Sequence, residues 1–218
     1  NSINLSGAHL GLTSATLQAA LFVGASVTAL DVRDNIFANS YDNSTSGTDK
    51  SYAVYSNAPA SSFTNINYND YFVSGTPGVL GFIGAADRTT LGAWQTATGQ
   101  DANSVAADPL FISSADLHIN ISGATSPVEN VGTPIAGVTI DFDGDTRSAS
   151  TPDIGADEVD RCLNVTCSTN TTCASYSCNP SNGICDEVFA PITTECRVSS
   201  DLCDADETCT GASAACPA

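Results

Sequence analysis

The cysteines divide this chain into two parts. All nine lie between Cys162 and Cys216, and no cysteine precedes them in the 218-residue sequence. Neighbouring cysteines have four to ten residues between them, whereas zinc sites usually contain tighter pairs. A tail of about 57 residues buries too little apolar surface to be stable alone, so it needs covalent cross-links. We therefore predict two domains, residues 1–160 and a disulfide-rich domain at residues 161–218.

A disulfide framework predicts an extracellular or secreted protein, because disulfides persist in oxidising compartments. Nine is an odd number, so one cysteine must stay free, pair with another chain or pair with residues beyond Ala218, and the sequence leaves the connectivity open. The candidate disulfide residues are Cys162, Cys167, Cys173, Cys178, Cys185, Cys196, Cys203, Cys209 and Cys216. Asn-x-Ser/Thr sequons also predict a glycoprotein, with candidate sites at Asn4, Asn43, Asn120, Asn164 and Asn170.

The net charge excludes two classes of partner. Asp and Glu outnumber Lys and Arg by 24 to 6, which gives a formal charge of -18. The sequence has no cluster of Lys and Arg that could neutralise phosphate groups, so we predict no binding to nucleic acid or to anionic membrane surfaces. The best apolar run, residues 17–27, is too short for a membrane span, and membrane insertion is not expected. The predicted partners are other protein subunits, with glycans as a second class.

Short apolar runs separated by Asn, Asp, Ser, Gly and Pro indicate an all-β front with many short strands. Such runs occur at residues 52–55, 63–66 and 79–83, and only 14% of the residues are charged. One helix is predicted within residues 88–99, where Leu91, Ala93, Trp94 and Ala97 recur at helical spacing. A β-sandwich and a stack of β coils both fit the intervals between these runs.

Several motifs of the front resemble those of a known family. Asn35 stands beside Ile36 and Phe37, as an inward asparagine does at the tight turns of right-handed parallel β-helices. Segments that resemble the closing coils of secreted β-helix repeat proteins lie at residues 68–72, 94–104, 107–111, 141–147 and 152–158. The resemblance covers about residues 25–160. It implies an all-β fold, a right-handed parallel β-helix solenoid followed by a small disulfide-rich, loop-dominated domain. The open end at Asn1 would then be covered by earlier coils or by another subunit.

The end of the chain resembles the disintegrin-like cysteine-rich modules of extracellular proteins. The matching pairs are, in order, Cys196-Arg197, Cys203-Asp204, Cys209-Thr210 and Cys216-Pro217. The upstream segment, residues 162–185, departs from the pattern of the animal modules. In that family the cysteine of the Cys-Asp pair can bond outside its own module, so the resemblance makes Cys203 the candidate for the odd cysteine. It also implies an adhesive loop without Arg-Gly-Asp, whose candidate residues are Arg197, Asp201 and Asp204.

An alternating acidic segment is the candidate metal site. Asp141, Asp143 and Asp145 would share one face of a strand, where three carboxylates repel unless a cation compensates. Calcium suits them, because it takes several oxygen ligands from Asp and from the backbone. The alternative is a turn in which Asp side chains accept bonds from backbone amides and Arg147 pairs with a carboxylate.

Candidate catalytic groups are scattered along the front. β-helix hydrolases cluster their carboxylates, whereas Asp34, Asp70 and Asp101 stand far apart in the sequence. His118 lies in an alternating stretch, residues 116–119, and is expected at the surface or at the edge of the core. We therefore predict that the chain is not an enzyme and has no catalytic or cofactor-binding residue, calcium apart. A polysaccharide lyase is the alternative.

These features together predict a non-catalytic extracellular structural or adhesive protein. An acidic front joined to a cross-linked tail suits a subunit or decoration of a cell-surface filament or appendage. The alternative function is a carbohydrate-binding or polysaccharide-lyase-like β-helix protein. In that reading, aromatic side chains such as Trp94 and Tyr55 would stack on sugar rings.

Overall fold

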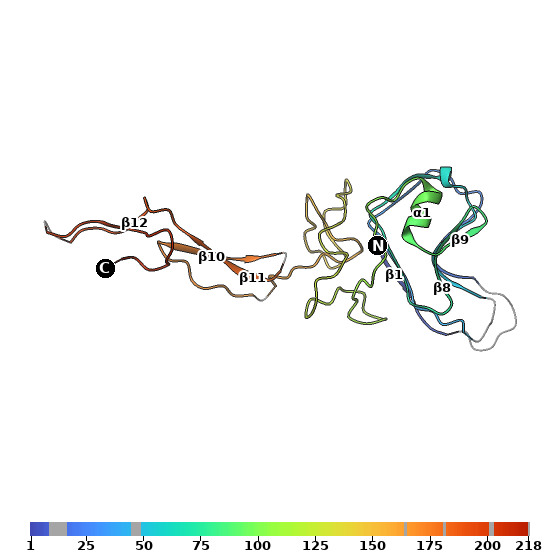
Figure 1. Ribbon diagram of the computed structural model, residues 1–218, viewed down its shortest axis with the longest axis horizontal. Coiled ribbons are helices and arrows are strands. Elements are labelled where there is room, and N and C mark those ends of the chain that lie inside the picture. The colour runs from blue at the N-terminus through green and yellow to red at the C-terminus, as the bar shows by residue number, and fades with distance from the viewer. Residues whose placement is uncertain (9–16, 45–48, 164, 181, 201–202, 218) are drawn as a thin grey trace. The chain divides into compact units, whose positions relative to one another are not determined.

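The computed structural model divides the chain into two compact units, the front unit Asn1–Val159 and the tail Asp160–Ala218 (Figure 1). It describes residues 1–8, 17–44, 49–163, 165–180, 182–200 and 203–217. Most of the regular elements in these ranges are β-strands. Within the same ranges, none of the helices has the length and apolar character of a membrane span.

Parallel pairing dominates the strands of the front unit. In the first sheet, β4 (Ile36–Asn39) lies between β1 (Ser2–Leu5) and β7 (Asp70–Val73). The second sheet has the order β2-β5-β8-β9, and the third pairs β3 with β6. These strands are β2 (Gln18–Val23), β3 (Leu30–Arg33), β5 (Ser51–Ser56), β6 (Phe63–Asn67), β8 (Gly78–Ile83) and β9 (Ala86–Arg88). Each parallel pair thus joins strands about one pass apart along the chain, where a pass is a stretch of 34 residues such as that from Ser2 to Ile36.

Asparagine side chains connect these passes at one turn. Asn1 Nδ2 donates to Asn35 Oδ1 over 3.0 Å, and Asn35 Nδ2 donates to Asn69 Oδ1 over 3.1 Å. The backbone amide of Asn69 donates to Ser104 Oγ over 2.7 Å. Both Asn35 and Asn69 are buried, and the two lie 34 residues apart. An unpaired buried amide costs about 1–3 kcal/mol, so these bonds favour one register between the passes.

The predicted right-handed parallel β-helix solenoid over residues 1–160 is wrong. The sheets formed by the described residues are small and separate, each with two to four strands, and none of them closes or continues as a solenoid. β9 pairs antiparallel with β8, so the largest sheet is mixed. Beyond Thr98, the described part of the front unit contains turns, bends and isolated bridges in place of strands.

Local hydrogen bonds explain why the segments that resemble closing coils form turns. Asp108 Oδ1 accepts a bond from the Leu110 amide over 2.9 Å. Asp141 Oδ1 accepts bonds from the amides of Asp143 and Asp145 over 2.9 and 2.8 Å. Side chains that bind nearby amides take away the donors that a strand ladder needs. The motifs at residues 107–111 and 141–147 therefore specify turns.

The helix predicted within residues 88–99 is present as α1 (Leu91–Thr98). Thr90 Oγ1 accepts a bond from the Ala93 amide over 3.2 Å, and the helix ends at Gly99 in the left-handed conformation, with φ 69°. Trp94 is fully buried against β8. A Cβ atom at Gly81 would lie 2.6 Å from the indole, so only glycine fits there without a shift.

A buried carboxylate holds the residues after α1 against this core. Asp101 Oδ2 accepts bonds from Trp94 Nε1 over 2.7 Å and from the Tyr71 hydroxyl over 2.5 Å. Asp101 Oδ1 accepts a bond from Ser104 Oγ. Burial raises the pKa of Asp101, although the hydrogen bonds oppose that shift. Three donors thus stabilise one carboxylate that is 1% exposed.

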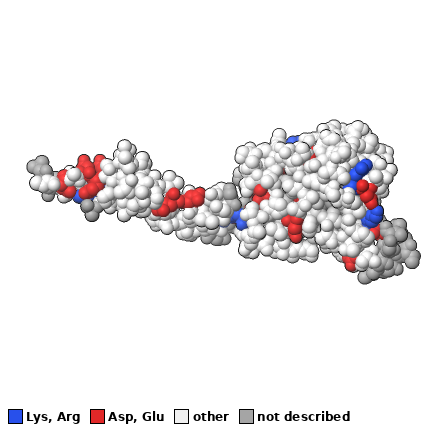
Figure 2. Space-filling view, in the orientation of Figure 1, with Lys and Arg blue, Asp and Glu red and all other residues white. Residues whose placement is uncertain are grey.

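Most basic side chains of the front unit are engaged with acidic neighbours. Arg33 pairs with Asp31 over 2.7 Å, and Lys50 pairs with Asp87. Figure 2 shows acidic side chains in several small groups on one face of the molecule, with fewer basic ones among them. Exposed pairs of this kind add about 0–1 kcal/mol each, so they contribute little to the stability of the fold.

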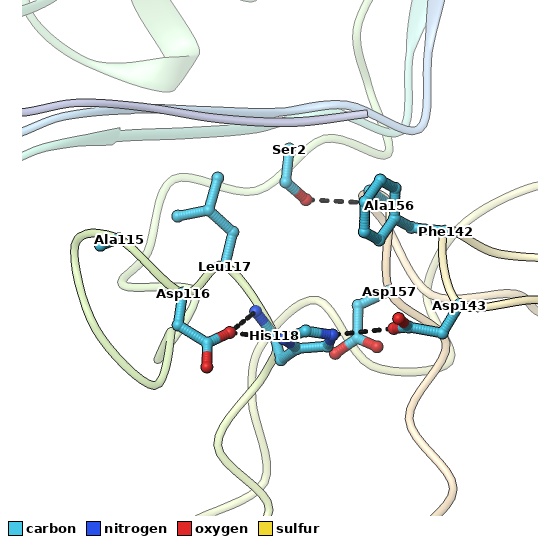
Figure 3. A pocket seen from close by; sticks show the side chains of 9 residues that line it. All are labelled: Ser2, Ala115, Asp116, Leu117, His118, Phe142, Asp143, Ala156 and Asp157. Atoms are coloured by element: carbon cyan, nitrogen blue, oxygen red, sulfur yellow. Dashed lines mark hydrogen bonds and ion pairs between the residues drawn. The ribbon is translucent and has the colours of Figure 1, made fainter.

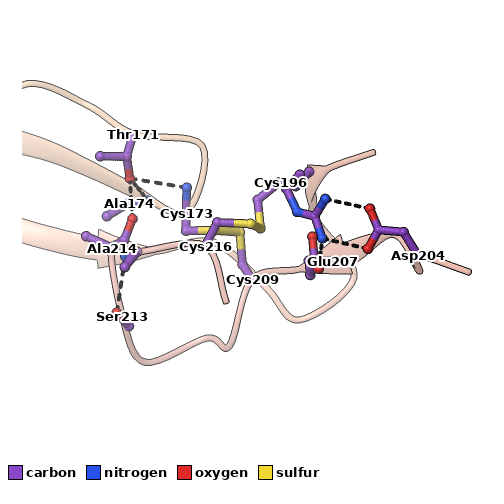
Figure 4. The surroundings of a disulfide bond; sticks show 12 residues. Thr171, Cys173, Ala174, Cys196, Asp204, Glu207, Cys209, Ser213, Ala214 and Cys216 are labelled. Carbon is purple, nitrogen blue, oxygen red and sulfur yellow. Dashed lines mark hydrogen bonds and ion pairs between the residues drawn. A yellow bond between two sulfur atoms is a disulfide. The ribbon is translucent and has the colours of Figure 1, made fainter. Parts of the chain in front are cut away.

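The tail is built on β-hairpins and disulfides. β10 (Ala174–Asn179) pairs antiparallel with β11 (Ile184–Phe189), and β12 (Glu195–Arg197) with β13 (Glu207–Thr208). The four disulfides are Cys162–Cys178, Cys167–Cys185, Cys173–Cys209 and Cys196–Cys216. Figure 4 shows the last two of them. Cys203 is in none of the four. They confirm a disulfide-bonded tail and indicate an extracellular or secreted protein.

We predict that Asp101→Asn destabilises the front unit. The asparagine side chain has one acceptor oxygen and one NH2 group. Whichever way it is oriented, the NH2 group faces a donor that now binds Asp101, so at least one buried donor loses its acceptor. The free energy of unfolding should fall by about 2–4 kcal/mol in urea titrations followed by Trp94 fluorescence. Asp108→Asn is the control, because Asp108 is exposed and an amide oxygen can still accept from Leu110. Equal stability of the two variants would refute the role of Asp101.

We also predict that the Cys173→Ser, Cys209→Ser double variant destabilises the tail more than Cys162→Ser, Cys178→Ser. The first disulfide closes a sequence separation of 36, against 16 for the second, which corresponds to about 4 against 3 kcal/mol of loop entropy. The rate of amide hydrogen exchange in β10 and β11 measures the stability of the tail. Fluorescence of Trp94 reports the front unit and should not change. Faster exchange in the second variant would contradict the prediction.

Candidate functional site

A pocket of the front unit lies between two irregular segments, a loop at residues 115–118 and a segment at residues 142–157 (Figure 3). Its volume is about 520 Å³. Its walls combine apolar side chains with one histidine and three aspartates. The lining residues are Ser2, Ala115, Asp116, Leu117, His118, Phe142, Asp143, Ala156 and Asp157.

His118 is held between two carboxylates. Its Nδ1 atom is bonded to Asp116 Oδ1, and its Nε2 atom lies 2.8 Å from Asp143 Oδ2. The hydrogen bond to Asp116, followed by that to Asp143, raises the pKa of His118 to about 9. Both bonds favour the protonated form of the imidazole. Its charge offsets the surrounding carboxylates.

Asp157 completes the group from the second segment. Its Oδ2 atom accepts a bond from the Ile119 amide over 2.7 Å, which links the two segments. Burial raises the pKa of Asp157, and the charge of His118 opposes that shift. One ligand atom from each of His118, Asp143 and Asp157 lies within 4.8 Å of the other two. We call these three residues the His-Asp-Asp cluster.

A hydrogen-bonded turn positions the second segment. Asp141 Oδ2 accepts from the Glu158 amide over 3.0 Å, while its Oδ1 atom closes the turn that carries Asp143. Arg147 is buried, donates to the carbonyl oxygens of Gly155 and Asp153, and lies 3.6 Å from Glu158. These bonds hold the two ends of the segment together, so Asp143 and Asp157 face the same histidine.

The predicted calcium residues do not converge. Asp141 uses its carboxylate to bind backbone amides, and Arg147 pairs with Glu158, as the alternative interpretation expects. Asp143 points toward His118, and Asp145 is exposed at the end of the turn. The structure thus brings one of the three aspartates, Asp143, into a different group. Calcium binding by the three together stays a prediction.

The sequence pattern does not connect His118 with Asp143, and it does not single out Asp157. One contact of the site has a local signal, because Asp116 precedes His118 by two residues and binds its ring. The rest is tertiary, since 25 residues separate His118 from Asp143.

The sequons lie in different environments. Asn43 is fully buried, and its Nδ2 atom donates to Ser51 Oγ over 2.8 Å, so the fold has no room for a glycan there. Asn4 is partly buried and donates to the Ser114 carbonyl over 3.3 Å. Asn120 and Asn170 are exposed, and Asn164 lies outside the described residues. Glycosylation stays a prediction, favoured by exposure at Asn120 and Asn170.

The predicted adhesive residues of the tail pair with one another. Arg197 donates to both carboxylate oxygens of Asp204, over 2.7 and 2.9 Å, and also contacts Glu207 (Figure 4). The guanidinium group lowers the pKa of Asp204. Asp201 lies outside the described residues. An adhesive role stays a prediction, and Arg197 would have to exchange these partners in order to bind a ligand.

The scattered aspartates of the front are buried structural residues. Asp34 accepts a bond from the Thr133 amide over 3.0 Å, and Asp101 accepts from Trp94 and Tyr71. Asp70 is fully buried, and its Oδ1 atom accepts from the Ala107 amide over 3.1 Å. Its Oδ2 atom has no hydrogen-bond partner among the described residues. Burial raises the pKa of Asp70 to about 7.

Comparison with known proteins gives no relative. No family model matches the chain, and neither the curated proteins nor the solved structures include a significant match. The resemblances to secreted β-helix repeat proteins and to disintegrin-like modules are therefore not supported, and the separate small sheets contradict the first.

We predict that the stability of the front unit falls as the pH rises from 5 to 8. The pKa values of Asp70 and Asp153 are raised to about 7 in the folded state, above the value of about 4 for an unfolded aspartate. The folded state therefore binds more protons in this range, and each group should lose on the order of 2 kcal/mol of stability.

Asp70→Asn tests this prediction in urea titrations at several pH values. The amide can still accept from Ala107 and does not ionise, so the loss of stability from pH 5 to 8 should be smaller than that of the unmodified protein by the contribution of Asp70, on the order of 2 kcal/mol. Asp145→Asn is the control, because Asp145 is exposed. An unchanged pH dependence in Asp70→Asn would show that Asp70 does not hold its proton in the folded state.

Proposed function

We propose that this chain is an extracellular structural or adhesive protein that joins a cell-surface assembly through the open edges of its parallel ladders. The supporting observation is the arrangement of β1, β2 and β3. Each has a strand partner on one side only among the described residues. The backbone groups along the other side can pair with a strand of another protein subunit.

Apolar side chains on these edge strands support the proposal. Ile3 on β1 is 37% exposed, and Phe22 on β2 is 53% exposed. The Phe22 ring stacks on Tyr55 with centroids 5.9 Å apart, and Tyr55 stacks on Phe82 at 4.3 Å. An added strand would cover Ile3 and Phe22, and an aromatic residue on it would continue the column. Burial of such side chains stabilises an interface by about 25 cal/mol per Å².

The opposite side of the second sheet does not offer the same edge. β9 folds back antiparallel onto β8, and α1 packs against both strands. The edge that continues the parallel ladder of this sheet is therefore that of β2. A filament needs two contact surfaces on each subunit. Exposed apolar residues of the tail supply a candidate second surface, namely Ile184, Val188, Ile192 and Val198.

We predict that the full chain self-associates and that Phe22→Lys weakens this association at least about tenfold. A charged residue on an edge strand opposes the addition of a further strand. Light scattering during gel filtration over a range of concentrations measures the mass, and electron microscopy of the native material shows the assembly.

Ile112→Lys is the matched control, because Ile112 has the same exposed fraction, 53%, but lies outside the edge strands. Circular dichroism establishes that both variants fold. Ile3→Lys should act like Phe22→Lys. A chain that stays monomeric at its highest soluble concentration, or an equal effect of Ile112→Lys, would count against the open edges as the contact.

A further inference from the structure

The His-Asp-Asp cluster carries an inference that is independent of self-association. We propose that His118, Asp143 and Asp157 bind a divalent transition-metal ion of the zinc class at the edge of the pocket. Their ligand atoms lie within 4.8 Å of one another, and His118 Nε2 is 2.8 Å from Asp143 Oδ2. Ligands at about 2.1 Å from a tetrahedral zinc lie about 3.4 Å apart, so small side-chain movements suffice.

Asp116 supplies the second observation. It holds His118 Nδ1 from the side away from Asp143, which leaves Nε2 directed at the other two residues (Figure 3). Metal-binding histidines usually have their second ring nitrogen bonded to a carboxylate or carbonyl in this way, because the bond fixes the tautomer and the ring orientation. The ion would take the position of the Nε2 proton.

Asp157 has an equivalent support. Its Oδ2 atom is fixed by the Ile119 amide, which leaves Oδ1 for the ion. Asp143 is carried by the turn that Asp141 closes. Each of the three ligands is thus positioned by a bond that does not involve the other two. Such support is what a bound metal needs from its surroundings.

The chemistry of the set favours zinc over calcium. One imidazole nitrogen and two carboxylates are typical ligands of zinc and its neighbours, whereas calcium takes six to eight oxygens. Three protein ligands leave at least one coordination position for water or another oxygen donor. The pocket beside the cluster is lined by Leu117 and Phe142. It would accept a small ligand with an oxygen donor at one end and an apolar body.

Zinc binding to the full chain tests the proposal. Isothermal titration should show one site that excess calcium does not displace. His118→Gln and Asp157→Asn should each weaken it at least about tenfold, and Asp116→Asn should weaken it by about 10–100-fold. Asp145→Asn and Cys203→Ser are the controls, because they remove an exposed carboxylate of the same turn and the thiol outside the disulfides. Neither control should change the affinity.

Nuclear magnetic resonance of the unmodified protein keeps the test valid if a variant fails to fold. The chain has two histidines, so ring nitrogen spectra resolve them individually. Zinc should shift Nε2 of His118 and leave its Nδ1 hydrogen bonded. Three results would overturn the proposal. Zinc could shift the signals of the other histidine only, excess calcium could displace the bound zinc, or His118→Gln could bind zinc with unaltered affinity.

Discussion

Hydrogen bonds between successive passes of the chain determine the arrangement of the front unit. The parallel ladders align each strand with one from the previous pass, and the bonds among Asn1, Asn35 and Asn69 favour a single register. The first of these passes, residues 1–34, is also hydrogen bonded to the C-terminal end of the front unit. Ser2 Oγ accepts from the Ala156 amide over 2.9 Å, and the Asp34 carbonyl accepts from Gly155 over 3.2 Å. The register of the parallel strands therefore positions the pocket, although Ser2 is the one strand residue among its described lining residues.

Sequence could predict the parts of this fold that depend on local chemistry. Cysteine spacing predicted the cross-linked tail, and helical spacing around Trp94 predicted α1. It could not predict where regular strands stop. Asp108 and Asp141 stand in motifs that resemble strand-forming coils, yet their side chains bind nearby amides and produce turns. Whether an amide pairs with a neighbouring side chain or with a distant strand is decided by tertiary contacts.

The same competition explains what sequence missed at the site. A strand would have placed Asp141, Asp143 and Asp145 on one face, which motivated the calcium prediction. In the turn that forms, Asp141 faces inward to the amides and Asp143 turns out toward His118. His118 and Asp143 are 25 residues apart in the sequence and become neighbours only in the folded chain. Patterns of two-residue alternation cannot reveal a group whose members come from separate irregular segments.

The two units illustrate two ways of stabilising segments that lack extended ladders. The tail uses disulfides, which restrict the unfolded chain. The last third of the front unit has neither disulfides nor strands among its described residues, and it depends on Asp101, Asp141 and Arg147 binding backbone groups. A metal ion held by His118, Asp143 and Asp157 would connect two of these irregular segments. Because it would bind the folded state selectively, its binding free energy would add to stability, as a cross-link does.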